Sequence, residues 1–332
     1  MEPVRVGVLG NGSWATAIVK MLSENTGQIG WYIRTAYTLE YLKNHRHNPK
    51  YIPQIEFDLD KLYLSNDINE IVRYADYLIV AIPSAFLKPE LDKIEVSLED
   101  KVIFSAVKGI IPENLMILGE YLTAAYGLDK KRLGVIAGPC HAEEVAMERL
   151  SYLTVAAGKK AYARQLASLL QSHYIKTTLS KDVHGIEWAA VLKNIYAIAA
   201  GVAHGLGYGD NFQAVLVSNA IREMRRFIKK NVDKKKRNIM RSAYLGDLLV
   251  TAYSTFSRNR LFGNMIGKGY TVKSAMMEMT MVAEGYYATK SAYLINEKKG
   301  QARTPIINAM YEILYNHKPA KEIMRELTGY LD

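Results

Sequence analysis

The sequence predicts an α/β protein, with a doubly wound parallel sheet in the N-terminal half and an all-helical domain in the C-terminal half. In the first half of the 332 residues, short apolar runs alternate with helical segments, which is the pattern of a parallel sheet covered by helices. From residue 182 onward, apolar residues recur at helical spacing and strand-like runs are scarce. A chain of this length suits two domains, and we expect them at residues 1–181 and 182–332.

The expected elements follow in order along the chain. In the first half, strands are expected at residues 4–9, 30–34, 77–82, 102–106 and 133–137, with a helix at 14–23. Residues 35–65 have mixed character, and their histidines, asparagine and proline suggest an irregular excursion. In the second half, helices are expected at 182–204, 211–231, 239–257, 271–296 and 303–316. The strands at 77–82, 102–106 and 133–137 end in polar or small residues, and ligands of doubly wound sheets bind at such carboxyl ends.

Composition favours a cytoplasmic protein that handles small anions. The N-terminal residues lead directly into a strand, so we expect no signal peptide, and no apolar run looks long enough to span a membrane. Cys140 is the single cysteine, which excludes an internal disulfide and fits a reducing compartment. The net charge of +10 suits anionic small molecules. The lysine-rich run at 229–237 lacks interleaved aromatic residues, so we expect a solvated surface and no nucleic acid there, and no residue spacing matches a metal site.

A glycine-rich loop follows the first strand. Residues 10–15, Gly-Asn-Gly-Ser-Trp-Ala, match the pattern G-x-G-x-x-A and open a helix. Gly10 and Gly12 permit a tight turn and a close approach of a pyrophosphate, and the helix N-terminus supplies free N–H groups. The position of this loop after the first strand predicts a dinucleotide-binding domain of the Rossmann type.

The end of the second strand lacks the acidic residue that usually binds the ribose hydroxyls of NAD. Arg34 lies near that place and can pair with a 2′-phosphate, which favours NADP or tolerance of both cofactors. The alternative is that Arg34 is simply exposed to solvent.

Further polar residues stand at strand ends. Lys108 follows the strand at 102–106 and faces the expected ligand crevice, or else it is an exposed lysine at a turn. Gly138 and Pro139 form a turn after the strand at 133–137, and the helix that follows offers N–H groups to an anion. Cys140 and His141 are neighbours in sequence and need not face each other, so we do not expect a nucleophile and its base there.

Two constellations in the helical half are suited to chemistry. Lys193 lies in the middle of an apolar helix, where desolvation would lower its pKa and suit it to proton transfer, unless it snorkels to the helix surface. Asp247, and the cluster of Ser257, Arg258 and Asn259, supply a carboxylate, a hydroxyl, a bidentate cation and an amide. Such a set suits a phosphate and a substrate hydroxyl, whereas the alternative is a capped helix end with a surface arginine.

In this order, these blocks resemble the NAD(P)-dependent glycerol-3-phosphate dehydrogenases of the bacterial type over nearly the whole chain. The resemblance implies a Rossmann domain and a helical domain, as in the 6-phosphogluconate dehydrogenase-like superfamily. It implies reversible reduction of dihydroxyacetone phosphate to sn-glycerol 3-phosphate, a glycerophospholipid precursor, with NADP or NAD as cofactor. Arg34 and the missing acidic residue slightly favour NADP. Lys193 would be the general acid/base, and Lys108 would touch substrate and cofactor.

The resemblance also implies the other contacts. Substrate contacts would come from Lys108, Gly138, Cys140, Lys193, Asp247, Ser257, Arg258 and Asn259. Cofactor contacts would come from Gly10, Gly12, Ser13, Trp14, Arg34, Lys108, Ala142, Arg258, Val282 and Glu284. Cys140 and His141 depart from the usual Ser or Thr followed by Phe, and a thiol is a weaker donor than a hydroxyl. Thr35 follows Arg34 where a second basic residue would favour strict NADP selectivity.

Other functions remain open from the sequence. The chain could be a dehydrogenase of the same superfamily that acts on a hydroxy acid or an acyl thioester, although the arginine cluster favours a phosphorylated substrate. A nucleic-acid-binding protein would show salt-dependent binding. A nucleotide sensor without turnover fits poorly with Lys193 in an apolar helix. The long helices are compatible with a homodimer, but the sequence indicates no interface.

Overall fold

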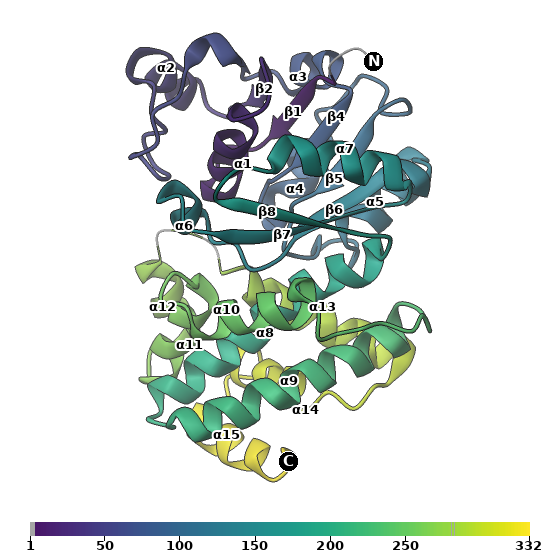
Figure 1. The fold of residues 1–332 in the computed structure, drawn as a ribbon. Helices are drawn as coiled ribbons and strands as arrows, with labels where there is room; N and C mark the ends of the chain where they lie inside the picture. The colour runs from purple at the N-terminus through teal and green to yellow at the C-terminus, as the bar shows by residue number, and fades with distance from the viewer. Residues whose placement is uncertain (1–3, 280, 282) are drawn as a thin grey trace. The chain divides into compact units, whose positions relative to one another are not determined.

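The computed structural model describes residues 4–279, 281 and 283–332, and it divides the chain into two compact units (Figure 1). Unit 1 comprises Met1–Val107 and Met116–Val183, and unit 2 comprises Lys108–Leu115 and His184–Asp332. The boundary expected between residues 181 and 182 lies two residues before the chain enters unit 2 for the second time.

Unit 1 is built on an eight-stranded sheet in the order β3-β2-β1-β4-β5-β6-β7-β8. The strands are β1 (Val6–Leu9), β2 (Ile29–Tyr32), β3 (Leu62–Ser65), β4 (Tyr77–Val80), β5 (Val102–Ser105), β6 (Leu133–Ala137), β7 (Ser151–Ala157) and β8 (Ile175–Ser180). The first six strands pair in parallel, with Leu9 of β1 opposite Tyr32 and Val80. β7 is antiparallel to β6, and β8 is parallel to β7. The strand order reverses at β1, which confirms the predicted doubly wound sheet.

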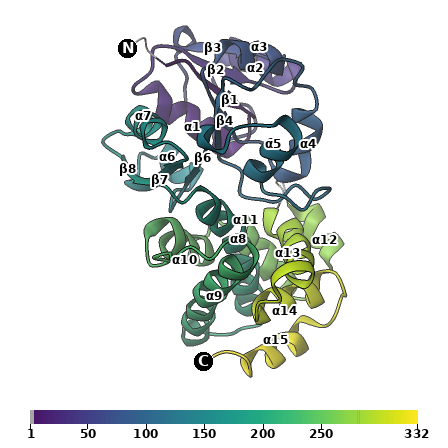
Figure 2. The same cartoon turned by 90° about the vertical axis from the view of Figure 1, so that its right-hand side faces the viewer.

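Helices cover both faces of this sheet (Figure 2). They are α1 (Ser13–Ser23), α2 (Ala36–His45), α3 (Ile68–Tyr74), α4 (Ser84–Leu91), α5 (Leu118–Tyr126), α6 (Ala142–Ala146) and α7 (Lys160–Leu170). Alternation along β1 explains the two faces. Val6 and Val8 belong to the buried cluster that includes α1, α6 and α7, whereas Gly7 lies against Ile71 of α3.

Parts of unit 1 differ from the sequence prediction. The irregular excursion expected at 35–65 contains α2 and β3, so that prediction is wrong in part. Thr35 begins α2, because its hydroxyl accepts from the N–H of Thr38, and Arg46 ends it in the left-handed conformation. The strands β7 and β8 are absent from the prediction.

Unit 2 is helical. Its helices are α8 (Val183–Gly205, whose first residue belongs to unit 1), α9 (Asp210–Asn231), α10 (Asp247–Tyr253), α11 (Arg258–Gly267), α12 (Val272–Glu278), α13 (Glu284–Ile295), α14 (Pro305–Leu314) and α15 (Ala320–Thr328). The single helix expected at 271–296 is wrong, since α12 ends at Glu278 and α13 begins at Glu284. The helices α11 and α15 are absent from the prediction.

The helix α8 is the apolar centre of the helical part. By length and hydropathy α8 would pass for a membrane span, contrary to the expectation that no apolar run is long enough. The most apolar 18-residue window of α8 is buried throughout, as in the core helix of a globular domain.

Glycines bring α8 and α11 into direct backbone contact. A Cβ at Gly201 of α8 would overlap the carbonyl oxygen of Arg260, and one at Gly263 of α11 would overlap that of Ile198. The two helices therefore cross as closely as their backbones allow, which fixes where α11 begins relative to α8.

Candidate active site

The glycine-rich loop has the geometry of a pyrophosphate cradle. Gly10 has a φ of +118°, and a Cβ there would lie 2.7 Å from the carbonyl oxygen of Ala81, so only glycine fits without strain. A Cβ at Gly12 would meet nothing within 4 Å, which leaves open space over the loop. Gly12 is also the N-cap of α1, whose first turn carries no acidic residue. These features fit a dinucleotide whose pyrophosphate approaches the backbone and the helix N-terminus.

Two side chains hold this loop in place. The indole Nε1 of Trp31 donates to the carbonyl oxygen of Gly10 over 2.8 Å. The amide of Asn48, which is fully buried, donates to the carbonyl oxygen of Asn11 and to the hydroxyl of Thr16. The segment expected to be an irregular excursion therefore supplies a support of the loop, a role that the sequence does not indicate.

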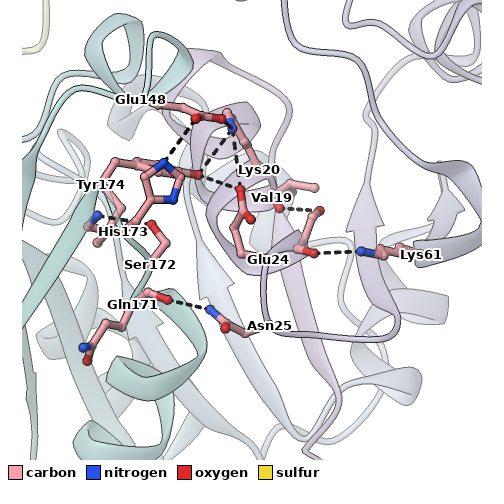
Figure 3. A network of polar contacts seen from close by, with 12 residues as sticks. Val19, Lys20, Glu24, Asn25, Lys61, Glu148, Gln171, Ser172, His173 and Tyr174 are labelled. Carbon is pink, nitrogen blue, oxygen red and sulfur yellow. Dashed lines mark hydrogen bonds and ion pairs between the residues drawn. The ribbon is translucent and has the colours of Figure 1, made fainter.

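A polar network fixes the other end of α1 (Figure 3). Lys20 of α1 forms an ion pair with Glu148 over 2.7 Å and also donates to Tyr174, whose hydroxyl donates to Glu24. The lysine holds the pKa of Glu148 below its usual range. His173 lies 3.4 Å from the same carboxylate. Because these residues come from α1 and from the segments that flank β7 and β8, the network ties the cofactor helix to the far edge of the sheet.

Arg34 is exposed just beyond β2. Its guanidinium lies 5.5 Å from the ring centre of Phe86, which is 43% exposed. The carboxylate near the end of β2 belongs to Glu90, and it accepts from the Tyr32 hydroxyl and pairs with Lys93. Burial and this carboxylate raise the pKa of Tyr32. Arg34 and Phe86 therefore offer a cation and an aromatic face at the strand end.

The predicted turn after β6 has the expected conformation. Gly138 has a φ of +128°, and a Cβ there would lie 2.6 Å from the carbonyl oxygen of Tyr152. Cys140 is a buried free thiol, and Ala142 begins α6. The first turn of α6 carries Glu143 and Glu144, so acidic side chains already lie at the positive end of this short helix.

The centre of the site in unit 2 is an ion pair between Lys193 and Asp247. Lys193 comes from the middle of α8 and Asp247 from the start of α10, and their side chains are only 4% and 2% exposed. The alternative that Lys193 snorkels to the surface is therefore wrong. The hydroxyl of Thr251, one turn further along α10, donates to the carbonyl oxygen of Asp247 over 2.6 Å.

Asn194 holds the main chain at Lys108 against α8. The side-chain amide of Asn194 donates to the carbonyl oxygen of Lys108 over 2.7 Å, and both residues belong to unit 2. Asn194 is buried and follows Lys193 directly in α8. The sequence shows the Lys-Asn pair, but the prediction assigns no role to the asparagine. An amide directly after the candidate acid in an apolar helix is the signal that could have indicated a role for Asn194.

The Ser-Arg-Asn cluster follows α10 and begins α11. Ser257 is the N-cap of α11, because its hydroxyl accepts from the N–H of Arg260 over 3.3 Å, so the capped-end alternative holds for this residue. The carbonyl oxygen of the Asn259 side chain accepts from the N–H of Gly285 over 2.9 Å. A Cβ at Gly285 would lie 2.5 Å from the carbonyl oxygen of Asn194, so α13 is held against both α8 and α11.

The structure thus gathers the predicted residues in groups. In unit 1, Gly10, Gly12, Ser13 and Trp14 form the loop and first turn of α1, Arg34 follows β2, and Gly138, Cys140 and Ala142 follow β6. In unit 2, contacts connect Lys108, Lys193, Asp247 and Asn259 to α8, α10 and α13, with Arg258 at the start of α11 and Glu284 at the start of α13. Val282 lies outside the described residues. Within the residues that the structure describes, no cluster of His, Cys, Asp and Glu could hold a metal ion.

Sequence comparison identifies relatives along the entire length. Residues 5–163 match the family model of the NAD-dependent glycerol-3-phosphate dehydrogenase N-terminus, and residues 182–325 match that of its C-terminus. The chain is 36% identical over 327 residues to glycerol-3-phosphate dehydrogenase (NAD(P)+) of Agathobacter rectalis, which covers 97% of this chain and 95% of that protein. It is 32% identical over 325 residues to the protein of that name from Bacillus subtilis, covering 97% and 93%.

Solved structures share the fold. The glycerol-3-phosphate dehydrogenase of Coxiella burnetii superposes with a TM-score of 0.89 at 24% identity, covering 98% of both chains. The enzyme of Plasmodium falciparum gives a TM-score of 0.82 at 21% identity, covering 97% and 94%. D-mandelate dehydrogenase gives 0.61 at 15% identity, covering 94% and 98%, so the fold extends to an enzyme of another name.

Proposed function

Because the chain belongs to the NAD-dependent glycerol-3-phosphate dehydrogenase family, we propose that it reduces dihydroxyacetone phosphate reversibly to sn-glycerol 3-phosphate. The cofactor is NAD or NADP, and both fit the family. Residues 1–181 form the cofactor domain in this proposal, and residues 182–332 form the substrate domain. The observation that carries the proposal is the buried Lys193–Asp247 pair, with Asn194 next to Lys193 in α8.

Lys193 donates the proton in this mechanism. A bound nicotinamide would supply the hydride for C2 of the ketone, and Lys193 delivers a proton to the carbonyl oxygen of the substrate. Asp247 holds the ammonium in place within a site that excludes water, and it also contacts a substrate hydroxyl. Lys108, whose backbone Asn194 fixes, stabilises negative charge on the same oxygen and contacts the cofactor.

Arg258 and Asn259 bind the phosphate. Because the side-chain oxygen of Asn259 accepts from Gly285, its NH₂ group is the part that can donate to a phosphate. Ser257 contributes through its position as the cap of α11, and Gly138 and Cys140 are the remaining substrate contacts in this proposal. The cofactor lies along Gly10, Gly12, Ser13, Trp14 and Arg34, with further contacts from Ala142, Val282 and Glu284.

An assay of NADH and NADPH oxidation with dihydroxyacetone phosphate tests this function. We expect turnover with either cofactor, and Arg258→Ala raises the KM for the ketone while the KM for the cofactor changes less. Oxidation of the cofactor with a keto acid, the oxidised form of a hydroxy acid, and none with dihydroxyacetone phosphate, contradicts the proposal.

A separate measurement of the molar mass by light scattering tests the oligomeric state, and a homodimer is expected. The enzyme acts in the cytoplasm in this proposal, where its product feeds glycerophospholipid synthesis.

A further inference from the structure

A polar cavity lies in unit 2, and none of its lining residues belongs to the candidate active site. Its volume is about 300 Å³. It is lined by Asn219, Arg222 and Arg226 of α9, by Arg303 just before α14, and by residues 329–332 after α15. Both views place the end of the chain beside α15 (Figures 1 and 2).

Three guanidinium groups line this cavity, and Asp332 is the one acidic residue among its lining residues. Arg222 forms an ion pair with Asp332 and donates to the side-chain oxygen of Asn219 over 2.7 Å. Asn219, which is buried, donates in turn to the main-chain oxygen of Asp332 over 3.0 Å. Asp332 thus forms an ion pair with one of the three guanidinium groups.

The other two arginines donate to main-chain oxygens. The Nε of Arg226 donates to the carbonyl oxygen of Arg303 over 3.1 Å, and Arg303 donates to the carbonyl oxygen of Tyr330 over 3.4 Å. Among residues 4–279, 281 and 283–332, neither guanidinium forms an ion pair with a carboxylate. The two terminal nitrogens of Arg226 therefore keep the paired donors that match an oxyanion bidentately.

A glutamate on the same helix does not neutralise them. Glu223 lies between Arg222 and Arg226 in sequence, but it is fully buried and faces α14. Its two oxygens accept from the N–H groups of Ile306 and Ile307 over 2.9 and 3.0 Å. Burial also raises the pKa of Glu223 to about 8, and its oxygens are directed at α14 and away from the arginines. The cavity therefore keeps its excess of positive charge.

We propose that this cavity, with its lining arginines Arg222, Arg226 and Arg303, is a second anion site that binds a phosphate monoester. Arginine forks pair with phosphate oxygens in a fixed plane, and a cavity of this size admits a phosphate with a few attached carbons. Asp332 competes with the ligand for Arg222. The ligand releases residues 330–332 from the arginines when it binds.

Equilibrium dialysis of the full chain with radiolabelled inorganic phosphate tests this site. The wild-type protein is expected to bind one equivalent more than Arg226→Gln/Arg303→Gln, while the KM for dihydroxyacetone phosphate is the same in both. Arg225→Gln removes the same charge from an exposed position of α9 outside the cavity and keeps the equivalent. Asp332→Asn binds phosphate up to about fivefold more tightly, because one surface ion pair is removed.

Further arms identify the source of the ligand. Glycerol 2-phosphate that displaces the label indicates a soluble monoester, whereas displacement only by vesicles that contain phosphatidic acid indicates a lipid headgroup of the same chemistry. Equal stoichiometry and affinity in the wild type and the double variant overturn the proposal. If the double variant fails to fold by circular dichroism, Arg303→Gln alone replaces it, and unchanged binding in that variant overturns the proposal equally.

Discussion

Lys193 and Asp247 form an ion pair from which solvent is almost completely excluded. Removing one partner of such a pair leaves a buried charge without compensation and costs about 3–5 kcal/mol. The pair therefore places a proton donor in a dry site, and it also couples the chemistry of the site to the stability of unit 2.

The side chain of Lys193 is expected to be essential for turnover. Lys193→Met removes the ammonium and keeps an unbranched apolar chain, so kcat falls by at least about 100-fold, which is the scale of general acid catalysis. Quenching of tryptophan fluorescence by NADPH measures cofactor binding, which should persist. The control is Lys290→Met, which makes the same change at an exposed position of α13 and should leave kcat unchanged. A Lys193→Met enzyme with kcat near the wild type contradicts the role of proton donor.

The pair is also expected to show strong coupling in unfolding experiments. Asp247→Leu and Lys193→Met each lower the free energy of unfolding by about 3–5 kcal/mol, because each leaves its partner unpaired. The double variant is more stable than either single variant, since no buried charge remains. Urea unfolding followed by fluorescence measures all three, and strictly additive losses argue against the buried ion pair.

The contact between α8 and α11 predicts a strong effect of one methyl group. Gly201→Ala places a Cβ against the carbonyl oxygen of Arg260, so the helices must separate. We expect a loss of about 1–3 kcal/mol, the scale of overpacking, and a higher KM for the phosphorylated ketone because α11 carries Arg258. Gly209→Ala is the control, since a Cβ there meets nothing within 4 Å. Equal thermal stability of the two variants contradicts the close crossing.

Arg34 is expected to distinguish the two cofactors. Arg34→Leu removes the cation that can pair with a 2′-phosphate, and hydrogen bonds to charged groups contribute about 1.5–3 kcal/mol. The KM for NADPH therefore rises about tenfold or more, while the KM for NADH changes little. Initial rates with each cofactor measure the ratio, and an equal rise in both values assigns Arg34 to the shared part of the dinucleotide.

Glu223 predicts how stability depends on pH. Burial raises its pKa from 4.5 to about 8 in the folded protein. Between these values the folded state holds a proton that the unfolded state releases. The stabilisation of the folded state by this proton is complete below pH 4.5 and is lost as the pH rises through 8. The expected slope is a decrease of about 1.4 kcal/mol per pH unit. Unfolding of Glu223→Gln across this range shows a flatter profile, and parallel profiles for both proteins contradict the prediction.

Local patterns account for the parts that the sequence predicts well. The alternation of strands and helices predicts β1, α1 and β2, because each of these elements, and the glycine-rich turn between β1 and α1, depends on residues that are close in sequence. Lys193 is identified because a lysine in an apolar helix stands out. The break between α12 and α13 is missed, since no proline marks it and both helices continue the same apolar pattern.

Contacts between distant residues account for most of the rest. Asn194 and Lys108 are 86 residues apart, and no pattern in either segment indicates their hydrogen bond. Asn48 supports the glycine-rich loop from a segment whose composition indicates only irregular structure. Ser257 is predicted as a substrate contact, and its hydroxyl caps α11 in the structure. A serine before a helix is typical of both roles, so the sequence leaves the two open.

The segment Lys108–Leu115 belongs to unit 2, although unit 1 precedes and follows it in the chain. A fragment that begins at residue 182 would therefore lack part of the helical unit, and a fragment that ends at 181 would carry Lys108 without Asn194. Recombination between homologous genes at the junction of residues 181 and 182 would combine Lys108 of one parent with Asn194 of the other. The two sides of that hydrogen bond have to be inherited together for a chimaera to keep its geometry.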